Sequence, residues 1–415
     1  MLAKTGLLVI LVAALVLVQC TRDFSVDTPG QETSELSPLQ KKVVTASDAF
    51  GVKLFKQVNL YQEPDENIFI SPFSVSMALG MTLNGAAGET AAAMRKTLEF
   101  DGLSQDAINT SYKNLTELLT GLDDKVLFEI ANSIWYQNTF SVEQQFIDVN
   151  KEYFGAQVQG LNFDAPESVD IINGWVYDRT HGRIDKIIER IERETVMFLL
   201  NAIYFKGTWQ YEFDKAKTVA DSFYTAKGSA VPCELMYQEN EFLYYENNDF
   251  QAIDLPYGDG RFSMSVLLPK PGVSLDSLVQ QLSPELWSQW FASFKKQEGL
   301  LYMPKFKMDY EITLNNVLKD MGMGVAFSPL AADFTGINKS GGLFITKVHH
   351  KTFVEVNEEG TEASAVTVVV IGRTSVGGDS RPFYMRVDRP FLFIIHEHQT
   401  GTILFIGKVV NPDGK

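Results

Sequence analysis

Residues 358–381 read EEGTEASAVTVVVIGRTSVGGDSR, and the interpretation of the whole chain starts from this segment. An acidic pair and several small residues come first. Val366–Ile371 follows, a run of β-branched residues that strongly favours a strand. Gly372–Gly378 then contains the glycine and serine that favour a turn or loop. Taken alone, the segment predicts a buried strand followed by a loop.

The two faces of this extended segment differ, because successive side chains of a strand point to opposite sides. One face begins with Glu362 and Ser364, and the Glu362 carboxylate favours water. The opposite face is therefore expected to point inward. It carries small residues first and larger ones later: Thr361, Ala363, Ala365, Thr367, Val369 and Ile371. Small inward residues at the start would let the segment enter between existing strands without a steric clash.

The composition is that of an ordinary globular protein. Of the 415 residues, 45% are apolar and 21% are charged. The formal net charge of -16 repels phosphate and sulfate groups, so neither nucleic acid nor an anionic polysaccharide is expected as a partner. The two cysteines, Cys20 and Cys233, supply no disulfide framework. Cys233 lies in a strand-like stretch and is expected to be a small, unreactive apolar residue.

The N-terminus is expected to be a targeting segment. Leu7–Val18 is an apolar run after the single charge of Lys4, too short to span a bilayer comfortably and typical of a signal peptide. Cys20 follows, as in a bacterial-type lipoprotein signal whose cysteine becomes lipidated, although Gln19 stands where a small residue is usual. Residues 1–20 are therefore a predicted signal peptide. Lipidation at Cys20, plain secretion and a retained anchor stay open; the first two place the protein outside the cytoplasm.

Residues 21–42 are polar, contain Pro29, Gly30 and Pro38, and predict a tether. From Val43 onward no second linker or repeat occurs, so residues 43–415 are expected to form one domain. Helical periodicity comes early and strand patterns come later, which predicts an α+β class. The expected helices are Val44–Tyr61, Ser74–Asn84, Glu89–Leu98 and Ile108–Leu119. The expected strands are Val196–Phe205, Phe262–Leu268, Pro390–Ile395 and Ile403–Ile406, the last two joined by a turn.

Motifs of common enzymes are missing from the sequence. It has no Gly-x-Ser-x-Gly elbow, no Walker A loop and no Gly-x-Gly-x-x-Gly. His396 and His398 miss the zinc-helix spacing because residue 400 is Thr, and a surface turn is expected there. His349 and His350 are the other histidines in a structured-looking context. No enzymatic activity, cofactor or metal is therefore expected.

A family resemblance then emerges from several blocks taken together. Val354–Ala365 (VEVNEEGTEASA) resembles the hinge of the serpins, the serine-protease-inhibitor family. Further blocks follow in the order of that family and extend the resemblance over residues 45–412: Asn67–Leu79, Gly85–Thr90, Asn201–Trp209, Asp254–Tyr257, Pro304–Phe306, Ala332–Ile337, Asp388–Ile394 and Leu404–Pro412. So many blocks in one order are far more specific than a single motif.

The resemblance implies one domain with three β-sheets and eight or nine helices. It also implies that residues 360–380 form an exposed reactive loop, within a segment of about 358–382, in place of the buried strand that the local pattern predicts. A target serine protease would cleave this loop and form an acyl-enzyme. The cut loop would then insert into the main sheet as a new strand. A non-inhibitory binding or storage protein of the same fold is the alternative.

Site residues are carried over by position in the matching blocks. The hinge comprises Glu358, Gly360, Thr361, Ala363, Ser364 and Ala365. The shutter, a polar cluster beneath the main sheet, comprises Ser71, Ser74, Asn201 and His350. Trp209 matches the breach, where the loop enters the sheet. No counterpart of a heparin-binding helix is evident, because the cations Arg95, Lys96, Lys113 and Lys125 are scattered among acidic and polar residues.

Two adjacent bonds are candidates for cleavage by the protease. The usual family spacing from Glu358 places the residue before the cut at Thr374. Arg373 is the isolated cation of the loop, and it suits the acidic specificity pocket of trypsin-like proteases. Arg373–Thr374 is therefore the predicted bond and Thr374–Ser375 the alternative. The expected partner is a trypsin-like serine protease, which would form a covalent 1:1 complex with this chain. The protein is expected to be a monomer. It is expected to contact a membrane only through a lipid at Cys20.

Overall fold

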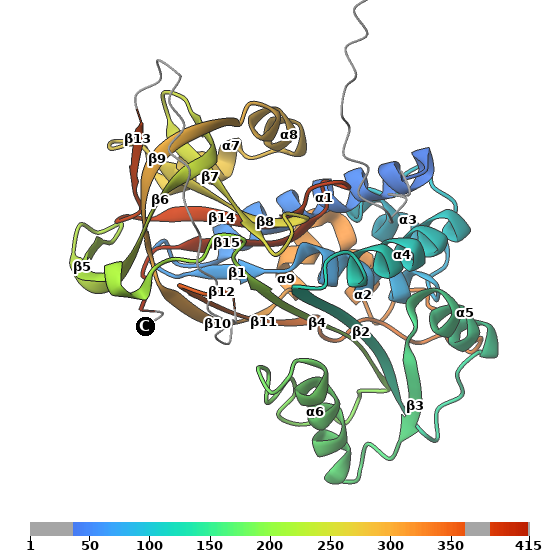
Figure 1. Ribbon diagram of the computed structural model, residues 1–415. Coiled ribbons are helices and arrows are strands. Elements are labelled where there is room, and N and C mark those ends of the chain that lie inside the picture. The colour runs from blue at the N-terminus through green and yellow to red at the C-terminus, as the bar shows by residue number, and fades with distance from the viewer. Residues whose placement is uncertain (1–35, 362–381, 414–415) are drawn as a thin grey trace, which may run out of the picture. The chain divides into compact units, whose positions relative to one another are not determined.

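The computed structural model describes residues 36–361 and 382–413 (Figure 1). The predicted signal peptide with Cys20, residues 21–35 of the predicted tether, and the loop segment 362–381 lie outside the described residues. The expectations that rest on these three segments therefore stay predictions.

Nine α-helices occur within the described residues, in agreement with the expected eight or nine. They are α1 (Pro38–Tyr61), α2 (Pro72–Leu83), α3 (Gly88–Thr97), α4 (Gln105–Thr120), α5 (Gln144–Phe154), α6 (Glu167–Arg179), α7 (Leu275–Gln281), α8 (Pro284–Ala292) and α9 (Asn315–Leu318). The four helices expected from periodicity are confirmed with small shifts of their ends. In the described part of the chain, no helix combines the length and the apolar character that a membrane span requires.

The first helix begins earlier than the sequence predicts. The Ser37 hydroxyl accepts the Gln40 backbone N–H and the Gln40 side chain bonds back to Ser37, which forms a capping box, while Pro38 occupies the first turn. Residues 38–42, predicted to be tether, are therefore helical. The polar composition of this stretch concealed a helix start.

The main sheet has six strands in the order β10, β11, β12, β4, β2, β3. Their bounds are β10 (Phe306–Thr313), β11 (His349–Asn357), β12 (Gly360–Thr361), β4 (Met197–Thr208), β2 (Val126–Gln137) and β3 (Gln157–Leu161). Neighbours pair antiparallel except β2 and β3, which are parallel. The long apolar run around Asn201 thus becomes β4, close to the expected bounds.

A second, nine-stranded sheet runs in the order β1, β15, β14, β8, β7, β6, β9, β13, with β5 also paired to β6. The bounds are β1 (Ile68–Ile70), β15 (Ile403–Val409), β14 (Phe391–Glu397), β8 (Phe262–Pro269), β7 (Phe250–Tyr257), β6 (Ala230–Glu246), β9 (Lys295–Pro304), β13 (Phe383–Arg386) and β5 (Val219–Tyr224). The expected antiparallel pair near the C-terminus is confirmed as β14 and β15.

The α+β class is confirmed, and two of the three expected sheets form one continuous ladder. The long strand β6 is the reason. It pairs with β5 through residues 230–235, with β9 through residues 235–244 and with β7 through residues 243–246, so it belongs to both halves of the second sheet.

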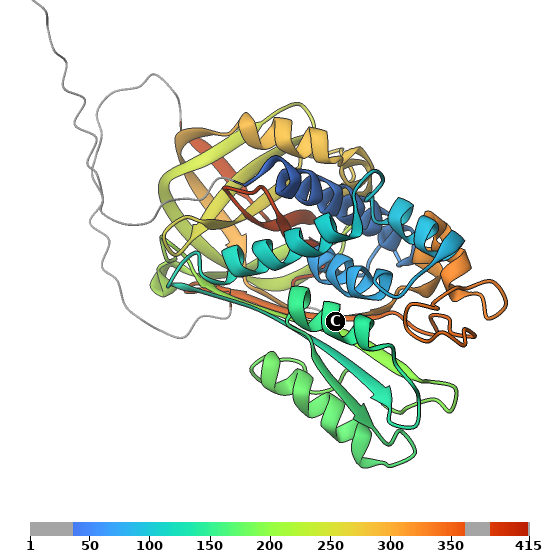
Figure 2. The ribbon, with the colours of Figure 1, turned by 90° about the vertical axis from the view of Figure 1, so that its right-hand side faces the viewer.

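Helices cover both faces of the main sheet. In Figures 1 and 2, α6 lies on one face, and α1 to α4 lie on the other. Beneath α6 a separate apolar cluster forms, in which Trp135 of β2 meets Trp175 of α6 with ring centroids 6.2 Å apart. The large core lies between the two sheets and the remaining helices. The helical cover is partial, because alternate side chains of β10, namely Lys307, Asp309 and Glu311, are exposed.

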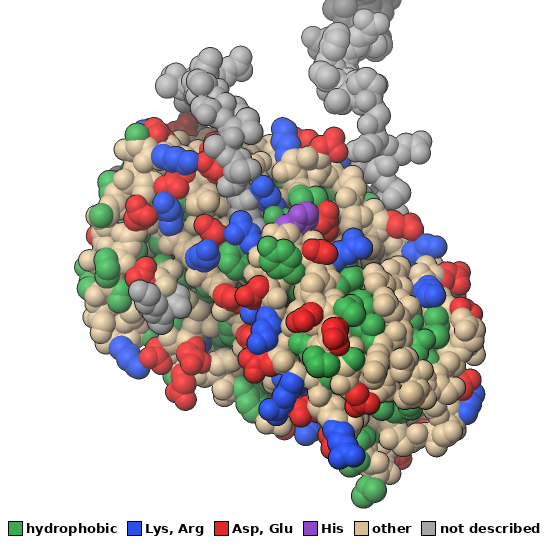
Figure 3. All heavy atoms as spheres, turned by 90° about the horizontal axis from the view of Figure 1, so that it is seen from below, with side chains coloured by type: hydrophobic (Ala, Val, Ile, Leu, Met, Phe, Trp, Pro, Cys, Tyr) green, Lys and Arg blue, Asp and Glu red, His purple; other side chains and the backbone are tan. Residues whose placement is uncertain are grey.

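Acidic and basic side chains are mixed on the face that Figure 3 shows. Among the four cations considered above, Lys125 forms an ion pair with Asp259 at 2.7 Å, and Arg95 donates to the Leu103 carbonyl at 2.9 Å. These cations also lie on different elements, α3, α4 and the segment before β2.

Candidate functional site

The short strand β12 lies between β11 and β4 at one end of the main sheet. Gly360 and Thr361 pair with Asn357 and Val356 on the β11 side, and with β4 on the other side. Thr361 is 2% exposed, and its hydroxyl oxygen lies 2.6 Å from the Tyr257 hydroxyl. The predicted inward direction of Thr361 is therefore what the structure shows, and the first hinge residues already occupy a strand position.

Gly360 is required at its position. Its φ is +150°, a conformation that residues with a side chain rarely adopt. A Cβ atom placed on it would lie 2.1 Å from the Gly207 carbonyl oxygen, which is far inside van der Waals contact. The close approach of β12 to β4 therefore depends on this glycine.

The acidic pair before β12 is buried and held by polar partners. Glu358 is 5% exposed, accepts the Thr218 hydroxyl at 2.8 Å and lies 3.5 Å from the Lys305 ammonium. Burial alone would raise the pKa of Glu358, but Thr218 and Lys305 together hold that pKa below its usual range. Glu359 forms an ion pair with Lys215.

These contacts correct the predicted exposure of the loop. The resemblance implied an exposed loop over residues 360–380, yet Gly360 and Thr361, its first two residues, are buried. Here Lys305 and Lys215, distant in sequence, satisfy the two carboxylates inside the fold.

Trp209 lies directly beside this segment. Its indole N–H donates to the Asn357 carbonyl and its backbone N–H donates to the Glu359 carbonyl, both at 2.9 Å. Its ring stacks on Tyr257 with centroids 4.4 Å apart. The sequence did not single out Tyr257 or Lys305, although each lies in a block that carried the family resemblance. Neither block alone indicates that its residue touches the hinge.

The main sheet is open beyond β12. Among the described residues, residues 197–203 of β4 pair with β2 on one side and with no strand on the other. Residues 349–355 of β11 likewise pair with β10 on one side only. A cavity of about 790 Å³ lies here and is lined by both strands. Residues of α2 and of the segment 184–190 after α6 also line it, so it reaches from one face of the sheet towards the other.

Three of the four predicted shutter residues form one hydrogen-bonded group. The Ser71 backbone N–H donates to His350 Nε2 at 3.0 Å, and the Ser71 hydroxyl donates to the Leu404 carbonyl at 2.8 Å. The Ser71 oxygen also accepts the Ser74 backbone N–H at 3.2 Å. Because Nε2 accepts this bond and burial lowers the pKa of His350 to about 3, the imidazole is neutral.

Asn201, the fourth shutter residue, lines the same cavity from β4 but forms its hydrogen bond with a residue outside this group. Its amide nitrogen donates to the Asn132 side-chain oxygen at 2.7 Å. Its own side-chain oxygen is buried and has no hydrogen-bond partner among the described residues. A buried polar atom without a partner is costly, so this edge of the cavity can still gain a hydrogen bond.

Two further expectations are settled by the structure. Cys233 lies in β6, and burial raises the pKa of its thiol to about 11, which disfavours the reactive thiolate. The predicted surface turn at His396 is wrong, because His396 is 1% exposed and belongs to β14. The turn begins after Glu397. The remaining hinge residues Ala363, Ser364 and Ala365, and both candidate bonds at Arg373–Ser375, lie outside the described residues.

Comparison with known proteins decides the family. The family model described as Serpin (serine protease inhibitor) matches residues 45–412. The chain belongs to the serpin family. Its relatives include neuroserpin of Gallus gallus, which is 33% identical over 411 residues, or 96% of this chain and 95% of that protein.

Solved serpin structures agree with this fold. The thermophilic serpin Tengpin in its native state has a TM-score of 0.81 at 32% identity, with 92% of this chain and 96% of Tengpin covered. Human thyroxine-binding globulin has a TM-score of 0.82 at 28% identity, with 90% of this chain and 100% of the globulin covered. Serpins are generally inhibitors of serine proteases.

The neutral, buried His350 gives a pH prediction for this serpin. Its folded pKa of about 3 lies below the ordinary 6.5, so the unfolded chain binds a proton that the folded chain excludes. This contribution is fully present above about pH 6.5 and is lost as the pH falls towards 3, with a limiting slope of about 1.4 kcal/mol per pH unit. His350→Asn should flatten the decline in stability between pH 6.5 and 4.

The measurement is the denaturant midpoint of both proteins at a series of pH values. The comparison uses slopes and not absolute stabilities, because Asn also alters the bond to Ser71. Parallel pH dependences in the two proteins would show that His350 is not the residue that takes up a proton on unfolding.

Proposed function

We propose that this serpin inhibits a serine protease as a suicide substrate whose cleaved loop inserts between β4 and β11. The observation that carries the proposal is β12 itself. Two hinge residues already pair with both strands at one end of a cavity that separates those strands further along. Residues 362 onward would continue this strand without a change of direction.

The proposed reaction starts with the protease serine. Its hydroxyl oxygen attacks the Arg373 carbonyl carbon, the bond to Thr374 breaks, and the Thr374 nitrogen leaves as an amine after taking up a proton. The resulting ester joins Arg373 to the protease. Insertion of residues 362–373 would then carry the protease along the main sheet and deform its active site before water hydrolyses the ester.

Insertion is favourable for two physical reasons. Serpin loop insertion is an established instance of strand addition, in which each new ladder hydrogen bond contributes about 1 kcal/mol net. Thr367, Val369 and Ile371 would point into the cavity, and burial contributes about 1.5–3 kcal/mol for each large apolar side chain. The hinge residues Ala363, Ser364 and Ala365 are small enough to follow Thr361 without steric hindrance.

The proposed target is a trypsin-like protease, because Arg373 is the isolated cation of the loop. The alternative bond, Thr374–Ser375, would favour a different protease. We also propose a monomer that forms a covalent 1:1 complex and acts outside the cytoplasm, either secreted or attached to a membrane through a lipid at Cys20.

The alternative function is that of a serpin-fold binding protein without inhibition. The similarity to human thyroxine-binding globulin, a protein named for its ligand, favours this alternative. The hinge favours inhibition, because a bulky or charged residue at Thr361, Ala363 or Ala365 would block insertion, and all three are small or β-branched. Incubation with trypsin separates the two functions: an SDS-resistant complex supports inhibition, and clean cleavage without a complex supports the alternative.

Arg373→Glu tests the specificity residue. The acidic pocket of trypsin repels a carboxylate, so this variant should lose inhibition of trypsin, while Arg373→Lys should retain it. Complex formation is measured by denaturing electrophoresis, and the new N-terminus of the released fragment is identified by mass spectrometry. A fragment that starts at Thr374 is expected. One that starts at Ser375, or full trypsin inhibition by Arg373→Glu, would contradict the assignment.

Thr361→Arg tests the entry of the loop. Arg at this position would lose the contact with Tyr257 and place a charge in a closed site, at a cost of several kcal/mol. Insertion should stall, and the variant should be cleaved at the wild-type rate without trapping trypsin. Thr361→Val is the matched control, since it removes the hydroxyl but keeps the shape and should still inhibit. Wild-type trapping by Thr361→Arg would contradict insertion through this hinge.

A further inference from the structure

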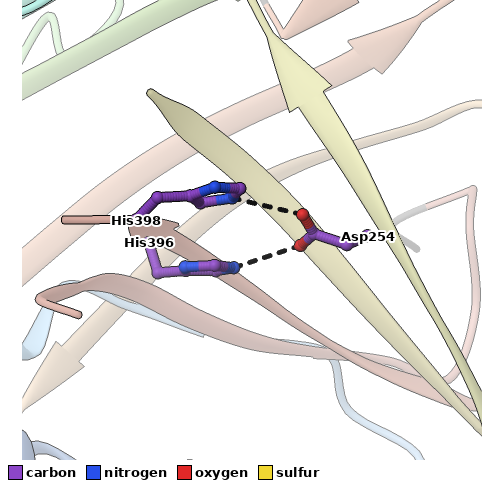
Figure 4. Close-up of side chains that lie close together, drawn as sticks. All are labelled: Asp254, His396 and His398. Atoms are coloured by element: carbon purple, nitrogen blue, oxygen red, sulfur yellow. Dashed lines mark hydrogen bonds and ion pairs between the residues drawn. The ribbon is translucent and has the colours of Figure 1, made fainter. Parts of the chain in front are cut away.

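A cluster of three metal-ligating side chains lies in the second sheet, separate from the hinge and the cavity. Asp254 belongs to β7, His396 to the end of β14, and His398 to the turn that follows (Figure 4). Strand β8 runs between β7 and β14, and its Ser265 pairs with Asp254 while its Ser263 pairs with His396. Three adjacent strands therefore bring together residues that are more than a hundred positions apart in sequence.

The ligating atoms converge on one point. His396 Nε2 and His398 Nε2 each lie 3.2 Å from an oxygen of the Asp254 carboxylate, Oδ1 and Oδ2 respectively. The three ligating atoms all lie within 4.8 Å of one another, and the two imidazole rings stack with centroids 5.1 Å apart. Figure 4 shows both rings directed at the carboxylate.

These separations suit a small divalent metal ion. Zn²⁺ binds imidazole nitrogen and carboxylate oxygen at about 2.0–2.2 Å in a tetrahedron, whose edges are then roughly 3.3–3.6 Å. The observed nitrogen–oxygen distances of 3.2 Å are close to such an edge. Three protein ligands leave the fourth position for water, which can approach past His398, whose side chain is 27% exposed.

The surroundings orient the ligands and exclude bulk water. The Ser265 hydroxyl donates to Asp254 Oδ1 at 2.5 Å and so fixes the carboxylate. From α8, Phe291 and Trp287 cover the His396 ring with centroids 4.9 and 5.3 Å away. An apolar cover of this kind strengthens the attraction between a cation and a carboxylate.

Hydrogen bonding alone accounts incompletely for the cluster. Asp254 Oδ2 is buried and, among the described residues, makes no well-directed hydrogen bond, although His398 Nε2 is near. His398 Nε2 instead lies 2.7 Å from the Ser263 hydroxyl.

We propose that Asp254, His396 and His398 bind one Zn²⁺ ion per chain. The ion would replace the contacts between the two imidazoles and the carboxylate and use the oxygen that lacks a hydrogen bond. It would join β7 to the end of β14 across β8. The search for a helical zinc motif misses this site, because His396 ends a strand and His398 lies in the turn that follows it.

Zinc titration of the tag-free, full-length protein tests this proposal. After dialysis against EDTA, calorimetry with ZnCl₂ should give one site per chain. His398→Ala should weaken binding by at least roughly 10- to 100-fold, the range caused even by loss of residues that only orient a metal ligand. His181→Ala is the matched control, because His181 also pairs with a carboxylate, Glu129 at 2.7 Å, outside the cluster. It should bind Zn²⁺ like the wild type.

A second measurement keeps the test independent of folding. His398 is partly exposed, so His398→Asn is also included, and circular dichroism confirms that each variant is folded. Co²⁺ bound to the wild type should show the intense visible absorption of four-coordinate cobalt, and both His398 variants should lose it. Absence of stoichiometric Zn²⁺ binding by the wild type, or equal weakening in the His181 and His398 variants, would overturn the proposal.

Discussion

The separation of β4 from β11 is the constraint on which the rest of this serpin depends. Strands inside a sheet normally satisfy their backbone groups on both sides. Here β12 joins the two strands at one end, and a cavity of about 790 Å³ separates them beyond it. A strand-forming segment directly follows β12 in sequence. In the proposed mechanism the fold would be kinetically trapped, and the missing strand would be supplied only after cleavage.

Local patterns predicted most regular elements but not the contacts that position the hinge. Periodicity predicted α2 and the β14–β15 pair, and alternation predicted that Thr361 points inward. Burial of Glu358 was not predictable locally, because its partners Thr218 and Lys305 are distant in sequence. The turn predicted at His396 failed for the same reason: its partner Asp254 lies on another strand.

Strand β7 connects the hinge to the proposed zinc site. Tyr257, at its end, contacts Thr361 and stacks on Trp209, while Asp254, on the same strand, belongs to the proposed zinc site. Both are polar groups in an apolar interior, where each needs a specific partner. Tyr257 meets a hinge residue within the main sheet, and Asp254 meets two histidines within the second sheet. The strand therefore links the entrance of the loop to the second sheet.

Insertion of the loop between β4 and β11 is tested most directly by hydrogen exchange of their backbone amides. Peptides covering residues 197–203 and 349–355 are followed by mass spectrometry before and after cleavage by trypsin. Insertion should give both peptides a large gain in protection after cleavage, because a new strand supplies their ladder partners, and should give no comparable gain in β14. Unchanged exchange in residues 197–203 and 349–355 of the cleaved protein would contradict insertion.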